Sequence, residues 1–190
     1  EFPAGFTAQF NVVYTTAKDW EGKMDIYLPS KDNRPTPVVI NIHGGGWNKG
    51  VKESHTGFNT FFKAGVAEAN IEYRLTGQAT APAAIEDTRC ALIYLIKNAN
   101  ELNIDVNRIV IMGGSAGGHL ALMGGLLAND HRFDTNCPGV ENIKVAAIID
   151  KYGSNVMALE HHTLTKSTMN NVLLLVKQLP KNIDLCVISH

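Results

Sequence analysis

The sequence predicts an α/β fold with a mostly parallel central sheet and helices on both faces. Three short runs rich in β-branched residues, VVINI (38–42), IVIM (109–112) and VAAII (145–149), have the continuous apolar character of strands that are covered on both sides. Segments with helical patterning separate these runs. Strands that alternate with helices predict parallel pairing through right-handed crossovers.

The other elements follow from local patterns along the chain. Residues 9–16 and 23–28 read as strands on either side of an Asp-Trp-Glu-Gly turn, which predicts an opening hairpin. A helix is expected over about 54–64 and a strand over about 66–73. Pro82 then begins a longer helix, because proline is favoured at the first helical position.

Composition and charge indicate one globular domain, residues 1–190, with 45% hydrophobic residues and a formal charge of −1. The 17 basic and 18 acidic side chains form no long run of either sign. This balance favours a neutral substrate and gives no electrostatic footprint for nucleic acid or an anionic membrane surface. No apolar stretch reaches the roughly 18 residues of a membrane-spanning helix. We therefore expect neither nucleic acid nor membrane as a partner.

The cysteine count is odd. Cys90, Cys137 and Cys186 form no close metal-ligand pair, and at least one of them must lack a partner within the chain. We expect buried free thiols and no metal site. The amino terminus lacks the charged-then-apolar pattern of an intact signal peptide, which leaves a leader that has already been removed as an alternative.

A glycine-flanked serine follows the IVIM strand. Gly113-x-Ser115-x-Gly117 matches a nucleophile elbow, a tight strand-to-helix turn that projects the serine hydroxyl above the carboxyl edge of a sheet. A helix is expected from about 117 to 128, which completes the required strand-turn-helix context. The alternative is a glycine-rich turn with an incidental serine. The context favours Ser115 as the catalytic nucleophile.

A glycine-rich loop, His43-Gly44-Gly45-Gly46-Trp47, follows the VVINI strand. Attack on an ester carbonyl places negative charge on its oxygen, and glycines let backbone N–H groups point at that oxygen. Gly45, Gly46 and Ala116 are the predicted oxyanion-hole donors. A phosphate site is the alternative, but the loop has no Lys-Ser/Thr pair and no Gly-x-Gly-x-x-Gly pattern before a helix.

Several charged or ionisable residues near these motifs are expected to be structural. A histidine fixed in an oxyanion loop holds that loop through ring hydrogen bonds, so His43 is not the predicted base. His119 is expected to brace the turn after the elbow. Asp87 and Arg89 are expected to stabilise their helix.

These motifs resemble those of the esterase/lipase branch of the α/β-hydrolases that carries an HGGGW loop and includes acetylxylan and feruloyl esterase-like carbohydrate esterases. The resemblance covers about residues 20–153. Its marks are DIYLP (25–29), HGGGW (43–47), EYRL (72–75), Pro82 to Asp87, Arg108-Ile109, GGSAGGHLA (113–121) and IIDKYG (148–153). The resemblance implies hydrolysis of short acyl esters, acetyl or feruloyl groups on plant polysaccharide, without cofactor. It implies a secreted or periplasmic location, with a cytoplasmic one as the alternative.

The rest of a catalytic triad does not follow from the sequence. In this fold the serine is followed by an acid and then a histidine on later loops, so both are expected after residue 153. The segment 179–190 looks like the approach to the strand that precedes them, and we expect the last strand or strands, the last helix and both residues beyond His190. Possible substitutes within the chain are Asp150, Asp184, His161, His162 and His190.

Two functions compete on these observations. The first is a serine carboxylesterase; the second is a catalytically impaired α/β-hydrolase fragment that binds ligand or a partner without efficient turnover. A lipase for long acyl chains is less favoured because no extended apolar lid segment is evident. A sheet without its last strands would expose an apolar edge, which predicts a homo-oligomer.

Overall fold

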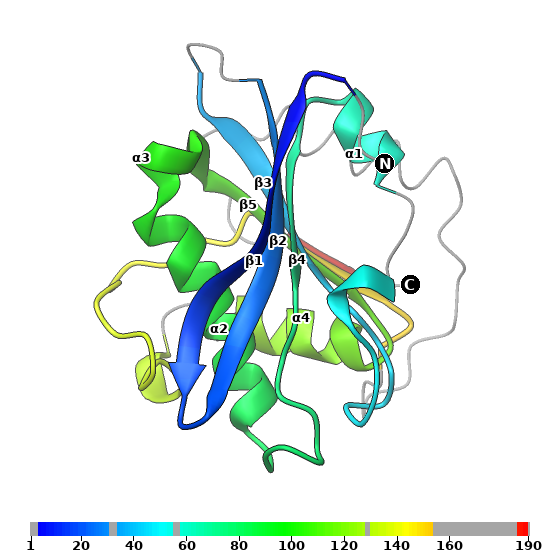
Figure 1. Ribbon diagram of the computed structural model, residues 1–190, viewed down its shortest axis with the longest axis vertical. Coiled ribbons are helices and arrows are strands. Elements are labelled where there is room, and N and C mark those ends of the chain that lie inside the picture. The colour runs from blue at the N-terminus through cyan, green and yellow to red at the C-terminus, as the bar shows by residue number, and fades with distance from the viewer. Residues whose placement is uncertain (1–3, 31–33, 55–57, 128–129, 154–185, 190) are drawn as a thin grey trace.

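The computed structural model describes residues 4–30, 34–54, 58–127, 130–153 and 186–189. Within them the chain forms one seven-stranded sheet with the order β1-β2-β4-β3-β5-β6-β7 (Figure 1). The strands are β1 (Phe6–Ala17), β2 (Trp20–Pro29), β3 (Thr36–Ile42), β4 (Ala67–Ile71), β5 (Ile104–Gly114), β6 (Ala147–Lys151) and β7 (Cys186–Ser189). The helical elements are η1 (Lys52–Ser54), α1 (Asn59–Lys63), α2 (Ala83–Lys97), α3 (Ala99–Leu102), α4 (Ala116–Leu126) and η2 (His131–Phe133).

The sheet is antiparallel at one edge and parallel elsewhere. β1 pairs with β2, and β2 with β4, in antiparallel orientation. β4, β3, β5, β6 and β7 are all parallel to their neighbours. The predicted opening hairpin and mostly parallel sheet are confirmed. The strand expected at 109–112 is longer than predicted, because β5 already begins at Ile104.

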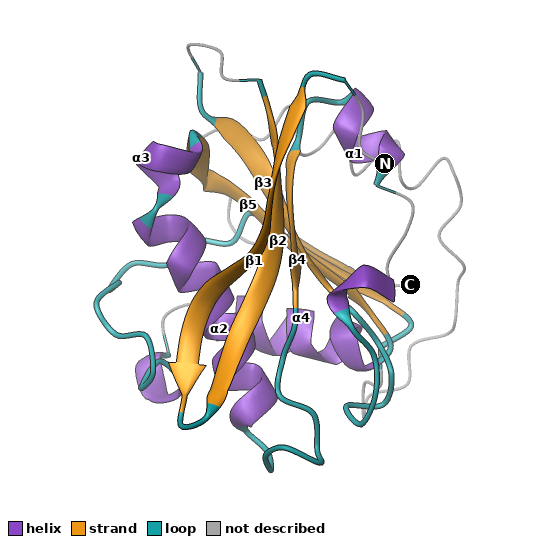
Figure 2. Cartoon of the chain, viewed as in Figure 1, coloured by secondary structure: helices purple, strands orange, loops and turns teal. Residues whose placement is uncertain are grey.

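Helices cover both faces of the sheet, as predicted (Figure 2). One face packs against α2, α3 and α4 through the larger core, which includes Ile40, Ile111, Leu92 and Leu120. The other face carries a smaller core around Val39, Val110 and Met112, to which α1 contributes Phe61. Figure 1 shows α1 and α3 on opposite sides of the strands. The helix expected over about 54–64 is shorter in the structure, where α1 spans Asn59–Lys63 and residues 55–57 lie outside the described part.

The expectation of free thiols is wrong for two of the three cysteines. Cys90 on α2 and Cys137 form a disulfide, with their Cα atoms 5.4 Å apart and a sequence separation of 47. The spacing in sequence gave no sign of this pair, because the fold brings the segment after η2 back onto α2. Next to it, Arg89 Nε and Nη2 each donate to the Asp134 carboxylate at 2.8 Å. Arg89 therefore has the structural role expected of it.

Candidate active site

Ser115 lies at the turn between β5 and α4. Its backbone angles are φ 55° and ψ −121°, a conformation that is costly for a residue with a side chain and that persists only where the surrounding structure enforces it. Two hydrogen bonds do so: the Ser115 N–H donates to the Lys151 carbonyl at 2.9 Å, and the His119 N–H donates to the Ser115 carbonyl at 3.1 Å. The structure thus places Ser115 in the strained turn that the motif predicts.

Glycines let the elbow pack against neighbouring backbone. A Cβ on Gly113 would lie 2.2 Å from the Gly117 carbonyl oxygen, and one on Gly117 would lie 2.2 Å from the Ile42 carbonyl oxygen. Real side chains do not approach this closely, so glycine is required at both positions. The first turn of α4 therefore lies directly over the end of β3.

The HGGGW loop lies beside the elbow, as the two motifs require. A Cβ on Gly44 would meet the Gly114 carbonyl oxygen at 2.8 Å. Gly45, Gly46 and Trp47 have φ values of 118°, 60° and 60°, which turn the loop sharply away from β3. Within the described residues, neither the Gly45 nor the Gly46 N–H donates to another group of the chain. These N–H groups remain available to a ligand.

Ala116 supplies the third predicted donor. It is the first residue of α4 and is fully buried. The first N–H groups of a helix have no partner within the helix, and the Ala116 N–H donates to no other group among the described residues. The structure brings all four predicted site residues, Ser115, Gly45, Gly46 and Ala116, to the carboxyl edge of the sheet, where β3 and β5 end side by side.

His43 braces the oxyanion loop. Its ring lies 4.3 Å from the Tyr73 ring in a stacked arrangement, and its Nδ1 lies 2.7 Å from the Gly44 carbonyl oxygen. The Tyr73 hydroxyl donates to the His43 carbonyl at 3.1 Å. Burial lowers the pKa of His43, partly offset by the Gly44 contact, so the ring is neutral near pH 7. These contacts fit a structural histidine.

His119 lies one helical turn after Ser115. Its ring meets the Trp47 ring edge-on at 5.4 Å, which connects the elbow helix to the oxyanion loop. Burial lowers the pKa of His119, and the nearby charge of Asp150 only partly offsets this effect. Among the residues that the structure describes, its buried Nδ1 has no hydrogen-bond partner. A buried polar atom without a partner is uncommon and calls for an explanation.

Asp150 and Tyr152 complete the surroundings of the elbow. Asp150 is 1% exposed and accepts a hydrogen bond from the Gly153 N–H at 2.8 Å. Its Oδ1 lies so close to Gly118 that a Cβ there would be 2.0 Å away. The Tyr152 ring lies against Gly114. The sequence indicates Asp150 only as a substitute catalytic acid, and its close packing against Gly118 in the first turn of α4 could not be predicted from it.

A base for Ser115 is not found among the described residues, none of which is hydrogen-bonded to its hydroxyl. Of the proposed substitutes, His161, His162, Asp184 and His190 lie outside the described part of the chain. The same residues contain no group of three His, Cys, Asp or Glu side chains arranged to hold a metal ion. They also contain no helix that is long and apolar enough to span a membrane.

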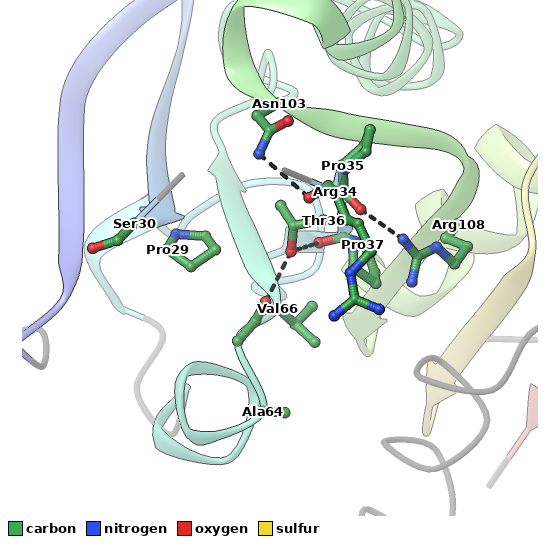
Figure 3. Close-up of a pocket in the computed structure, with 11 residues that line it drawn as sticks. Pro29, Ser30, Arg34, Pro35, Thr36, Pro37, Ala64, Val66, Asn103 and Arg108 are labelled. Atoms are coloured by element: carbon green, nitrogen blue, oxygen red, sulfur yellow. Dashed lines mark hydrogen bonds between the residues drawn. The ribbon is translucent and has the colours of Figure 1, made fainter. Parts of the chain in front are cut away.

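Two cavities lie at opposite edges of the sheet. One, of about 260 Å³, lies between the HGGGW loop and α4 and is lined by Trp47 and His119. The other, of about 390 Å³, lies where β3 and β5 begin (Figure 3). In the second cavity Arg108 donates to the Pro35 carbonyl at 2.6 Å and the Thr36 hydroxyl donates to the Gly65 carbonyl at 2.8 Å. Of these two cavities, the first is the one lined by residues of the HGGGW loop and of α4.

The sheet order, the serine elbow and the adjacent glycine loop define an α/β-hydrolase of the esterase/lipase branch. The sequence model of the BD-FAE family matches residues 24–189, and the chain belongs to this family.

Several of the relatives are named as esterases. The chain is 35% identical over 107 residues to the carboxylesterase NlhH of Mycobacterium tuberculosis, a match that covers 55% of this chain and 34% of that protein. Among solved structures, a bacterial heroin esterase superposes with a TM-score of 0.65 and 35% identity, covering 77% of this chain and 44% of the other. A truncated carbohydrate esterase from gut microbiota superposes with a TM-score of 0.65 and 29% identity, covering 88% of this chain and 65% of the other. The chain spans about a third of the length of the curated relatives it matches.

Proposed function

We propose that this protein is a serine hydrolase of carboxylic esters with short acyl groups. The observation that carries the proposal is Ser115 in a strained elbow that packs directly against the HGGGW loop. Strain of this kind is retained where it serves a function. The esterases among the relatives support the same reaction class.

The chemistry follows from the arrangement of these groups. The Ser115 oxygen attacks the ester carbonyl carbon, and its proton passes to a base. The N–H groups of Gly45, Gly46 and Ala116 hold the negative charge that develops on the carbonyl oxygen. The bond to the alcohol then breaks, the alcohol leaves with a proton, and water releases the acid from the acyl-serine.

Acetyl or feruloyl groups on plant polysaccharide are the proposed substrates. The carbohydrate esterase from gut microbiota supports a carbohydrate ester. The Cys90–Cys137 disulfide supports a secreted or periplasmic location, because disulfides persist in oxidising compartments.

Homo-oligomer formation is proposed as well. It is supported by Phe10 and Val13 on the edge strand β1, whose side chains are 58% and 40% exposed. A monomeric mass by light scattering at micromolar concentration contradicts the oligomer.

The second candidate function is ligand binding without efficient turnover. It is favoured by one observation: among the described residues, no imidazole is hydrogen-bonded to the Ser115 hydroxyl. His43 is engaged with Gly44 and Tyr73 instead.

Hydrolysis of p-nitrophenyl acetate by the wild type and by Ser115→Ala separates the two functions. The esterase proposal predicts turnover that falls by about a thousandfold or more in the variant. A binding function predicts equal, slow rates for both proteins. Because an oxyanion hole alone retains about 10³-fold catalysis over water, the comparison with the variant is decisive and a weak rate alone is not.

A further inference from the structure

The segment that follows the HGGGW loop, residues 48–52, packs back against the loop and is called the return segment below. Gly50 has a φ of 113°, and a Cβ on it would lie 2.4 Å from His43 Nδ1. The Asn48 N–H donates to the Gly45 carbonyl at 3.2 Å. Because the return segment and the loop are in direct contact, the position of one fixes the position of the other.

A buried ion pair holds the end of the return segment. The Lys52 Nζ lies 3.2 Å from Asp25 Oδ2 on β2, and these two side chains are only 2% and 6% exposed. Asp25 Oδ1 accepts a hydrogen bond from the Asn11 N–H at 2.8 Å, at the irregularity in β1 where Asn11 has a φ of 54°. Lys52 also pairs with Glu53, whose side chain is 59% exposed. Asp25 is thus fixed to β1 and β2, and Lys52 ties the return segment to Asp25.

Stability alone is a weak reason for this ion pair. Burying an ammonium and a carboxylate costs much of their hydration, and replacing such a pair with neutral residues of similar size is often neutral or stabilising. The Lys52–Glu53 contact adds little, because water screens an exposed pair. A buried ion pair differs from an apolar contact in that it favours one register of the segments that it joins. The Lys52–Asp25 pair therefore points to a role in the placement of the loop.

We propose that the Lys52–Asp25 ion pair positions the HGGGW loop so that the N–H groups of Gly45 and Gly46 point at the ester oxygen in the transition state. Lys52 and Asp25 are positioning residues, since they act through the loop. The inference rests on the proposed esterase function and extends it to groups outside the two glycine motifs. A misplacement of about 1 Å can cost about a hundredfold in rate, because the hydrogen bonds to the developing charge are lost.

Three neutral substitutions test the proposal through the hydrolysis of p-nitrophenyl acetate. Asp25→Asn removes the buried charge and keeps an oxygen that can accept the Asn11 N–H. Glu53→Gln removes an exposed charge from the same lysine, and Asp134→Asn breaks the buried pair with Arg89 elsewhere in the fold. Asp25→Asn is expected to lower kcat by about tenfold or more with KM changed by less than about twofold, the signature of a loss in the transition state alone. The two controls are expected to keep kcat within about twofold of the wild type.

The double variant Lys52→Met/Asp25→Asn separates positioning from stability. It leaves no buried charge of this pair, so its unfolding midpoint in urea is expected to lie near that of the wild type. Its kcat is expected to stay about tenfold below that of the wild type, because the directional contact is missing. It also carries the test if Asp25→Asn does not fold. A kcat that recovers together with the midpoint refutes the proposal, since the pair then serves stability alone.

Amide hydrogen exchange measures the loop without turnover. For the peptide that covers residues 43–51, Asp25→Asn is expected to raise the exchange rate by about tenfold, because the loop opens more often once its anchor is lost. Asp134→Asn is expected to leave the exchange of this peptide within about twofold of the wild type.

The outcomes separate the positioning role from the esterase function. If the wild type hydrolyses the ester but Asp25→Asn and Asp134→Asn lower kcat equally, the positioning role is refuted while the esterase function stands. If no ester is hydrolysed but exchange of the 43–51 peptide rises selectively in Asp25→Asn, the anchoring of the loop stands and the esterase function fails. Equal exchange of this peptide in the wild type and in Asp25→Asn refutes the positioning role whether or not the ester is hydrolysed.

Discussion

Removing the Cys90–Cys137 disulfide is expected to destabilise the fold strongly. The bond closes a loop with a sequence separation of 47 residues, between α2 and the segment after η2. In the chain-entropy account, cross-linking a loop of this length lowers the entropy of the unfolded chain enough to stabilise the fold by about 4 kcal/mol. Cys90 is 1% exposed, so alanine there also removes some packing. The double variant Cys90→Ala/Cys137→Ala is therefore expected to lose about 4 kcal/mol of unfolding free energy.

Urea denaturation followed by circular dichroism measures this loss. The wild type with a thiol reductant is expected to approach the double variant, and the double variant is expected to be insensitive to the reductant. A wild type whose unfolding midpoint is unchanged by the reductant, and equal to that of the double variant, would refute the reasoning.

Three further perturbations follow from single contacts. Gly117→Ala places a Cβ 2.2 Å from the Ile42 carbonyl oxygen and is expected to abolish serine reactivity, as measured by fluorophosphonate labelling; labelling at the wild-type rate contradicts it. Asp134→Asn removes the carboxylate that is paired with buried Arg89, and it is expected to lower the free energy of unfolding, measured by urea denaturation, by about 3 kcal/mol or more. A decrease of less than about 1 kcal/mol contradicts a stabilising role of this ion pair. Burial raises the pKa of Glu68 to about 9, so the folded state retains a proton that the unfolded state releases. The free energy of unfolding therefore falls as the pH rises from the usual carboxyl range to about 9. Glu68→Gln is expected to reduce this pH dependence of the free energy of unfolding. An equal pH dependence in the wild type and in Glu68→Gln would show that Glu68 is not its source.

Much of the fold could be predicted because local patterns and global topology agree. The β-branched runs became adjacent parallel strands, since a strand covered on both faces needs apolar residues at successive positions. The two glycine motifs could be placed at one edge because parallel strands end together. The register bears this out, with Ile42 opposite Gly113.

The parts that could not be predicted depend on contacts between distant segments. Cys90 and Cys137 are paired by the return of the chain onto α2, which no spacing rule encodes. The buried position of Asp150 under Gly118 required the three-dimensional packing of β6 against α4. The cavity between Trp47 and His119 likewise arises from three segments that are far apart in sequence.

Labelling with a fluorophosphonate, located by peptide mass spectrometry, tests the central claim most directly. The reagent reports an activated serine without the need for a chosen substrate. The account predicts one adduct, on Ser115, that is lost in Ser115→Ala and retained in the distant control Ser30→Ala. A wild-type chain that stays unlabelled while folded, or an adduct on another serine, would contradict the claim that Ser115 is the nucleophile.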